Sequence, residues 1–205
     1  MNRATRITAS ALGISAGIAS IEHGYFEVLQ GNAKPDGLFI VSMGPPCDPD
    51  IIWNACEPAL TIIPDFFITG ILAIIFGILT IIWSLGFLQR KHGGGILVLL
   101  SIGILLFGGG LFPPFIGIVA SIIATRIQNP LTWWRGHAES TASRSLVKLY
   151  PWAIIIYLCI ILGQFIVGYF FNDFFKSVMG ITVLLILGFL LLSGLSAFAY
   201  DAKRG

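Results

Sequence analysis

The sequence predicts an all-α integral membrane protein, a multi-pass transmembrane helical bundle of six hydrophobic segments. Hydrophobic residues make up 56% of the 205-residue chain, charged residues only 11%, and the mean hydropathy is +0.90. A typical soluble domain carries about 25% charged residues, so this chain has too few polar side chains to cover a soluble globule. Its apolar surface must therefore face lipid.

The six segments are the uncharged or nearly uncharged stretches of the chain. A helix needs about 20 residues to cross a hydrocarbon core of ~30 Å. We expect one integral membrane domain over 1–205, with an outer loop at 30–61 and a cytoplasmic loop at 128–150. The expected segments are residues 7–29, 62–88, 95–110, 112–127, 152–171 and 178–200.

The first segment follows a basic start, MNRATR, and a cleaved signal peptide would begin in the same way. Its apolar core is interrupted by Thr8, Ser10 and Gly13, and no small-x-small cleavage site stands out after it. We therefore expect a retained first helix, with a cleaved signal peptide as the alternative.

The third and fourth segments lie in one apolar stretch, 96–127, that is too long for a single ordinary span. The sequence GGGLFPP at 108–114 interrupts it with strong helix breakers. We expect a short hairpin of two segments of about 16 residues each, close to the lower limit for a crossing. A re-entrant hairpin that is buried in protein and does not cross fully is the alternative.

The basic residues determine the expected orientation, because Lys and Arg concentrate in cytoplasmic loops. Six crossings with both termini in the cytoplasm leave only Lys34 and Lys176 outside. The expected cytoplasmic set is Arg3, Arg6, Arg90, Lys91, Arg126, Arg135, Arg144, Lys148, Lys203 and Arg204. We expect this topology in the plasma (cell) membrane. Trp133, Trp134 and Arg135 are expected to anchor the interface, since Trp favours the headgroup region and Arg pairs with lipid phosphate.

The outer loop contains Cys47 and Cys56. Two cysteines in one loop of an oxidising compartment predict a disulfide. A thiolate metal site would need more ligands than these two. We therefore expect no metal and no cofactor.

The candidate site lies near the outer end of the first segment, where the sequence SIEHGYFEVLQ introduces Glu22, His23 and Glu27. His23 and Glu27 are four residues apart and share a helix face. Ionisable groups at this depth are costly and usually face the bundle interior or a water-filled cavity. Glu57 and Asp65 could approach from the outer loop and the start of the second segment. These five residues predict an outward-facing polar pocket.

The pocket indicates a binding or scaffolding component of the membrane. A component of a small-solute, cation or proton transporter is the first alternative. The later spans carry few polar groups for such a path, and Gln164 is the clearest polar side chain in the fifth segment. An intramembrane enzyme using His23 and a carboxylate is the second alternative. The sequence contains no HExxH motif and no nucleotide-binding loop, so an enzyme is the less favoured expectation.

Small residues at four-residue spacing form faces on the first two segments, where helices can approach closely. These residues are Ala9, Gly13 and Gly17 in the first segment and Thr69, Ala73 and Gly77 in the second. The faces could meet each other, a second copy of the chain or another membrane protein. Membrane lipids are expected partners. Nucleic acid is not, because the basic residues are scattered at loop ends.

Overall fold

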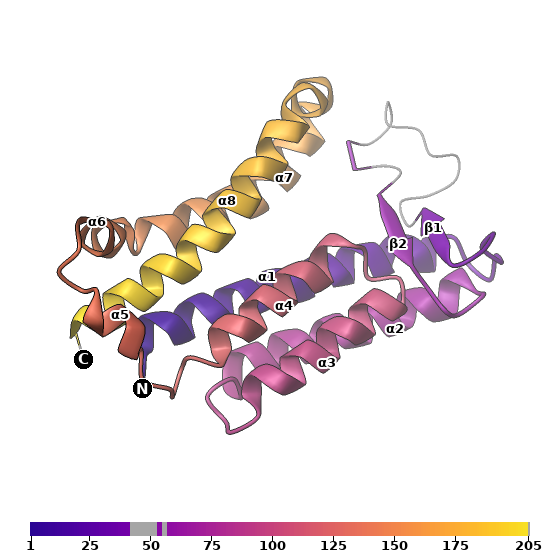
Figure 1. The fold of residues 1–205 in the computed structure, drawn as a ribbon. Helices are drawn as coiled ribbons and strands as arrows, with labels where there is room; N and C mark the ends of the chain where they lie inside the picture. The colour runs from indigo at the N-terminus through magenta and orange to yellow at the C-terminus, as the bar shows by residue number, and fades with distance from the viewer. Residues whose placement is uncertain (42–52, 55–56, 205) are drawn as a thin grey trace.

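The computed structural model describes residues 1–41, 53–54 and 57–204. This part of the chain forms eight helices and one small antiparallel sheet (Figure 1), which confirms the all-α class. The helices are α1 (Arg3–Leu29), α2 (Phe66–Gly86), α3 (Gly93–Leu106), α4 (Phe112–Ala124), α5 (Thr132–Gly136), α6 (Thr141–Leu149), α7 (Trp152–Phe170) and α8 (Asn172–Arg204). The sheet pairs β1 (Phe39–Val41) with β2 (Pro58–Leu60), with Ile40 opposite Ala59.

Four helices in the described residues, α1, α2, α7 and α8, are long and apolar enough to cross a membrane. This finding is consistent with a multi-pass membrane protein. Helices α3 and α4 have 14 and 13 residues. At 1.5 Å per residue each is only about 20 Å long, less than the thickness of a hydrocarbon core. Six full crossings are therefore not confirmed.

Helices α3 and α4 pack side by side as a hairpin (Figure 1). Helix α3 ends before the expected residue 110 because Gly108 and Gly110 adopt φ angles of 81° and 82°, a left-handed conformation that favours glycine and ends a helix. Helix α4 begins at the expected residue and ends at Ala124 instead of 127. The turn is also fixed by β2, since the Gly108 amide donates to the Leu60 carbonyl at 2.8 Å. The hairpin turn and the strand pair thus lie together.

The second half of the chain also differs in detail from the expected segments. Helix α8 is longer than 178–200, and it begins almost directly after α7. The expected loop at 128–150 contains the short helices α5 and α6. Helix α6 forms after a favourable N-cap, because the Ser140 hydroxyl accepts a hydrogen bond from the Ser143 amide at 3.2 Å.

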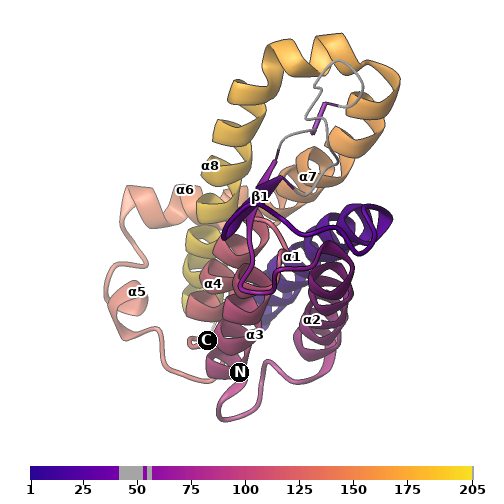
Figure 2. The same ribbon diagram turned by 90° about the vertical axis from the view of Figure 1, so that its right-hand side faces the viewer.

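The long helices form two groups, α1–α4 and the α7–α8 hairpin. The groups lie together near the chain termini and diverge toward β1 and β2 (Figure 1). The end with both termini, the α2–α3 connection, α5 and α6 is called the basic end here, and the end with β1 and β2 the strand end. The view from the strand end shows α7 and α8 standing apart from α1–α4 (Figure 2).

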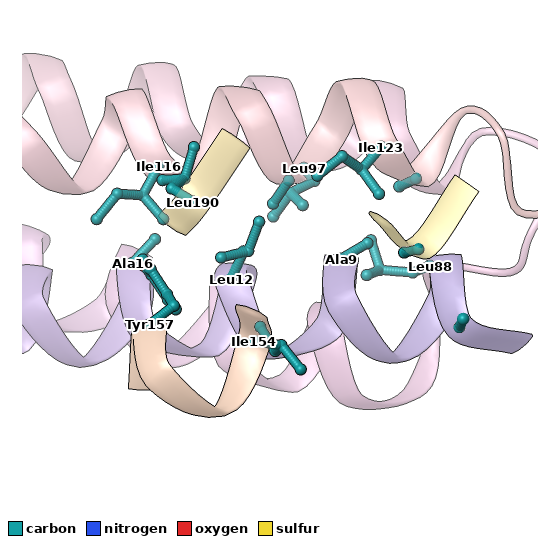
Figure 3. Close-up of a cluster of buried hydrophobic side chains, with 14 of the residues drawn as sticks. Ala9, Leu12, Ala16, Leu88, Leu97, Ile116, Ile123, Ile154, Tyr157 and Leu190 are labelled. Carbon is teal, nitrogen blue, oxygen red and sulfur yellow. The ribbon is translucent and has the colours of Figure 1, made fainter. Parts of the chain in front are cut away.

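Helix α1 contacts both groups, packing against α2, α4, α7 and α8. The main apolar cluster surrounds it: Leu12 and Ala16 face Ile116 of α4, Leu190 of α8 and Tyr157 of α7 (Figure 3). Of the four long helices, α1 has the lowest hydropathy and the largest buried share. Its small and polar residues are therefore covered by protein rather than exposed to lipid.

Close backbone approach joins α1 to α2. A Cβ atom on Gly17 would lie 2.6 Å from the Gly77 carbonyl oxygen, and one on Gly70 would lie 2.6 Å from the Gly24 carbonyl oxygen. Between these crossings the Ser20 hydroxyl donates to the Ala73 carbonyl at 2.9 Å. The small-residue faces thus meet within one chain, as packing in lipid favours. A protein partner at these faces stays a prediction.

The basic end is joined by a carboxylate from the last helix. Asp201 of α8 is buried and accepts hydrogen bonds from the amides of Ala4 and Thr5, at 3.0 and 2.7 Å, and from the Thr5 hydroxyl at 2.8 Å. These amides belong to the first turn of α1, whose N–H groups have no partner within the helix. Asp201 therefore acts as a helix cap supplied by another helix.

Substituting Gly17→Ala should destabilise the protein by about 1–3 kcal/mol, because the new methyl group would collide with the Gly77 carbonyl. Gly188→Ala is the matched control, since a Cβ there meets no other atom within 4 Å. Unfolding in detergent micelles with increasing SDS measures both. Equal stability of the two variants would contradict the close packing of α1 and α2.

Candidate functional site

A cavity of about 90 Å³ lies between α1, α4, α7 and α8 at the strand end, with residues of the 30–61 loop on its wall. Its lining is mainly aliphatic and aromatic. Five polar side chains also line it, and they are Glu22, His23, Glu57, Gln164 and Thr182. An apolar cavity with a few converging polar groups is the usual form of a small-molecule site.

His23 connects α1 to the segment just before β2. Its side chain is almost fully buried, and its Nε2 atom lies 3.0 Å from Oε2 of Glu57, whose side chain is 42% exposed. The α3–α4 turn leaves the space for the imidazole, because a Cβ atom on Gly110 would lie 2.5 Å from the His23 Nε2. The pair thus links the buried helix face to the more exposed edge of the cavity.

Glu22 is held from the other side by the loop. Its Oε1 atom accepts a hydrogen bond from the Asn54 Nδ2 at 3.0 Å. Trp53, which precedes Asn54 in the chain, is buried, and its ring centroid lies 4.7 Å from that of Phe175. Gly168 of α7 makes room for this indole, since a Cβ there would lie 2.2 Å from Trp53 Nε1. The loop thereby bridges α1 and the α7–α8 hairpin and closes one side of the cavity.

Glu27 lies outside the cavity and is completely buried. Neither carboxylate oxygen has a hydrogen-bond partner among the described residues. The carboxylate faces Gly108, where a Cβ atom would come within 2.3 Å of Oε2. An isolated buried carboxylate is costly, so this residue stores unfavourable free energy in the native fold.

The three turn glycines therefore have a shared role. Ser20 lies against Gly109, His23 against Gly110 and Glu27 against Gly108. A side chain on any of these glycines would collide with the α1 residue that faces it. From the sequence, GGG at 108–110 predicts only a helix break. The repeated polar positions on one face of α1 were the signal that a side-chain-free turn packs against it.

Asp65 is placed away from the cavity. It is the N-cap of α2, where Oδ1 accepts a hydrogen bond from the Ile68 amide at 2.9 Å. Of the five predicted site residues, the structure brings Glu22, His23 and Glu57 together. Gln164 and Thr182 were not predicted as site residues, although Gln164 is conspicuous as a polar group within an apolar span.

The other predicted positions lie elsewhere. Trp133, Trp134 and Arg135 belong to α5 at the basic end, where Trp133 is 63% exposed and Trp134 stands 6.1 Å from Phe198 between ring centroids. Their anchoring role in the membrane interface stays a prediction. Cys47 and Cys56 lie outside the described residues, so the disulfide also stays a prediction.

No protein-family model, curated protein or solved structure matches this chain. Within residues 1–41, 53–54 and 57–204, no three His, Cys, Asp or Glu side chains gather as the ligands of a metal ion would. The function must therefore be inferred from the geometry of the cavity.

Substituting Glu27→Gln should keep or raise stability, by up to about 2 kcal/mol, because it preserves the side-chain shape and removes the cost of burying an ionisable group whose oxygens have no hydrogen-bond partner among the described residues. Glu139→Gln is the control, since that exposed carboxylate pairs with Arg144 at 2.6 Å on the surface and should contribute less than about 1 kcal/mol. SDS unfolding in micelles measures both. A clear loss of stability in Glu27→Gln would mean that the carboxylate has a cationic partner.

Proposed function

We propose that this chain is a plasma-membrane protein that binds a small ligand in the cavity at the strand end, as a binding or scaffolding component of the membrane. The observation that carries the proposal is the convergence of Glu22, His23 and Glu57 on the wall of an otherwise apolar cavity. Buried ionisable groups in membrane helices usually serve a functional site, because their cost must be offset.

The proposal includes a topology in which the strand end faces outward. Both chain termini, the α2–α3 and α4–α5 connections, α5 and α6 gather at the basic end, and these segments carry ten of the twelve basic residues (Figure 1). The positive-inside rule favours the cytoplasm for that end. We propose six segments, with α3 and α4 as a short third and fourth hairpin. Cys47 and Cys56 would then face an oxidising compartment, which favours a disulfide.

Binding is favoured over transport by the depth of the ionisable groups. Glu22, His23 and Glu57 all lie at the strand end, whereas the buried polar side chains of α1 nearer the basic end are hydroxyls, such as Ser15 and Thr8. A proton relay would need ionisable groups at successive depths.

Native mass spectrometry of gently extracted protein tests the proposal. The wild type should carry a co-purifying small molecule that His23→Ala loses, because that substitution removes the partner of Glu57 and a wall of the cavity. The matched control is Asp65→Asn, which alters a carboxylate at the same end but outside the cavity and preserves a helix cap. It should keep the bound molecule.

Size-exclusion profiles and thermal unfolding of the three proteins separate ligand loss from misfolding. The proposal is contradicted if folded wild type, His23→Ala and Asp65→Asn carry the same bound masses in the same amounts. In that case the cluster would act as a structural network between α1 and the loop.

A further inference from the structure

Acidic side chains outnumber basic ones in the lining of the cavity. Glu22 and Glu57 line it together with one imidazole, His23, and no lysine or arginine is among its described lining residues. The basic residue beside lining residue Phe175 is Lys176, and it pairs with Asp173 at 3.0 Å. A positively charged ligand would be attracted, and an anion repelled.

Glu22 and Glu57 disfavour each other's ionised form, because like charges in a desolvated site repel strongly. Asn54 partly compensates this repulsion by donating to Glu22 at 3.0 Å. A cation near both carboxyl groups would favour their ionised forms more than a neutral molecule could. The two acidic side chains therefore favour a cationic ligand.

Part of the remaining wall is aromatic. Trp53 is inclined by 68° to Phe165 and by 71° to Phe175, with ring centroids 6.1 and 4.7 Å apart. All three rings line the cavity. The faces of aromatic rings attract ammonium groups, and tryptophan does so best. Such walls suit the alkyl groups of an organic cation better than a hydrated metal ion.

We infer that the cavity selects a small organic cation, an amine or methylated ammonium, with its charge toward Glu22 and Glu57 and its alkyl groups against Trp53, Phe165 and Phe175. This inference rests on the proposed function, because it names the ligand class of the same cavity. The volume of about 90 Å³ limits the ligand to a molecule of a few non-hydrogen atoms or to the ammonium group of a larger one.

Choline and 3,3-dimethyl-1-butanol provide the test, because they have nearly the same shape and differ in one positive charge. Calorimetric titration of the protein in nanodiscs, with empty nanodiscs subtracted, measures both. Choline should bind the wild type on the order of tenfold more tightly than the neutral alcohol. This comparison needs no variant and so does not depend on a substitution being tolerated.

Two variants test the assigned residues. Glu22→Gln and Trp53→Leu should each reduce choline affinity on the order of tenfold, with little change for the neutral alcohol. Asp65→Asn should leave both affinities unchanged, since that carboxylate lies outside the cavity.

Equal binding of choline and the alcohol would overturn the inference while leaving a ligand site in place. Binding of neither probe by folded wild type would also overturn it. Native mass spectrometry would still test the proposed function in that case, so a failure of this inference can be distinguished from a failure of the proposed function. Choline selectivity that survives in both Glu22→Gln and Trp53→Leu would assign the cation to another site and contradict the inference.

Discussion

The close contact between α1 and α2 is the constraint on which the remaining structure depends. Gly17 with Gly77 and Gly24 with Gly70 bring the two backbones together, so that α1 can lie inside the bundle instead of facing lipid. In lipid, such packing replaces the hydrophobic effect as the force between helices. Once α1 is enclosed, its polar residues become tolerable, and α4, α7 and α8 can pack around it.

The strand end follows from the same enclosure. Ser20, His23 and Glu27 project from α1 toward a turn of three glycines, which β2 holds through the Gly108 amide. The α7–α8 hairpin diverges from α1–α4 toward this end (Figure 1). Trp53 packs against Phe175 there, and residues of both groups line the cavity. At the other end, Asp201 joins α8 to the first turn of α1. The two groups, α1–α4 and the α7–α8 hairpin, are thus joined at the basic end and separated at the strand end.

Much of this arrangement could be predicted from the sequence, because hydropathy and helix breakers act locally. The class, the long helices and the break at 108–114 depend on runs of neighbouring residues. The end of α3 could not be read in the same way, since it depends on left-handed glycines and on pairing with β2. At the site, Glu22, His23 and Glu57 were predicted together, with Glu27 and Asp65, because buried charge needs a partner. The capping role of Asp65 is a local interaction with Ile68, whereas the place of Thr182 on the cavity wall depends on tertiary packing.

The central claim is that polar residues enclosed by the bundle line a cavity open to the outside. Cysteine accessibility in intact cells tests it directly. The comparison is between Gln164→Cys, on the cavity wall, and Ile166→Cys, on the face of α7 that is exposed on the surface of the bundle, where Ile166 is 64% exposed. A membrane-impermeant thiosulfonate added outside should label Gln164→Cys above the wild-type background, whereas Ile166→Cys, facing lipid, should stay at background. Labelling of Ile166→Cys alone, or of Gln164→Cys only after the cells are opened, would contradict the account.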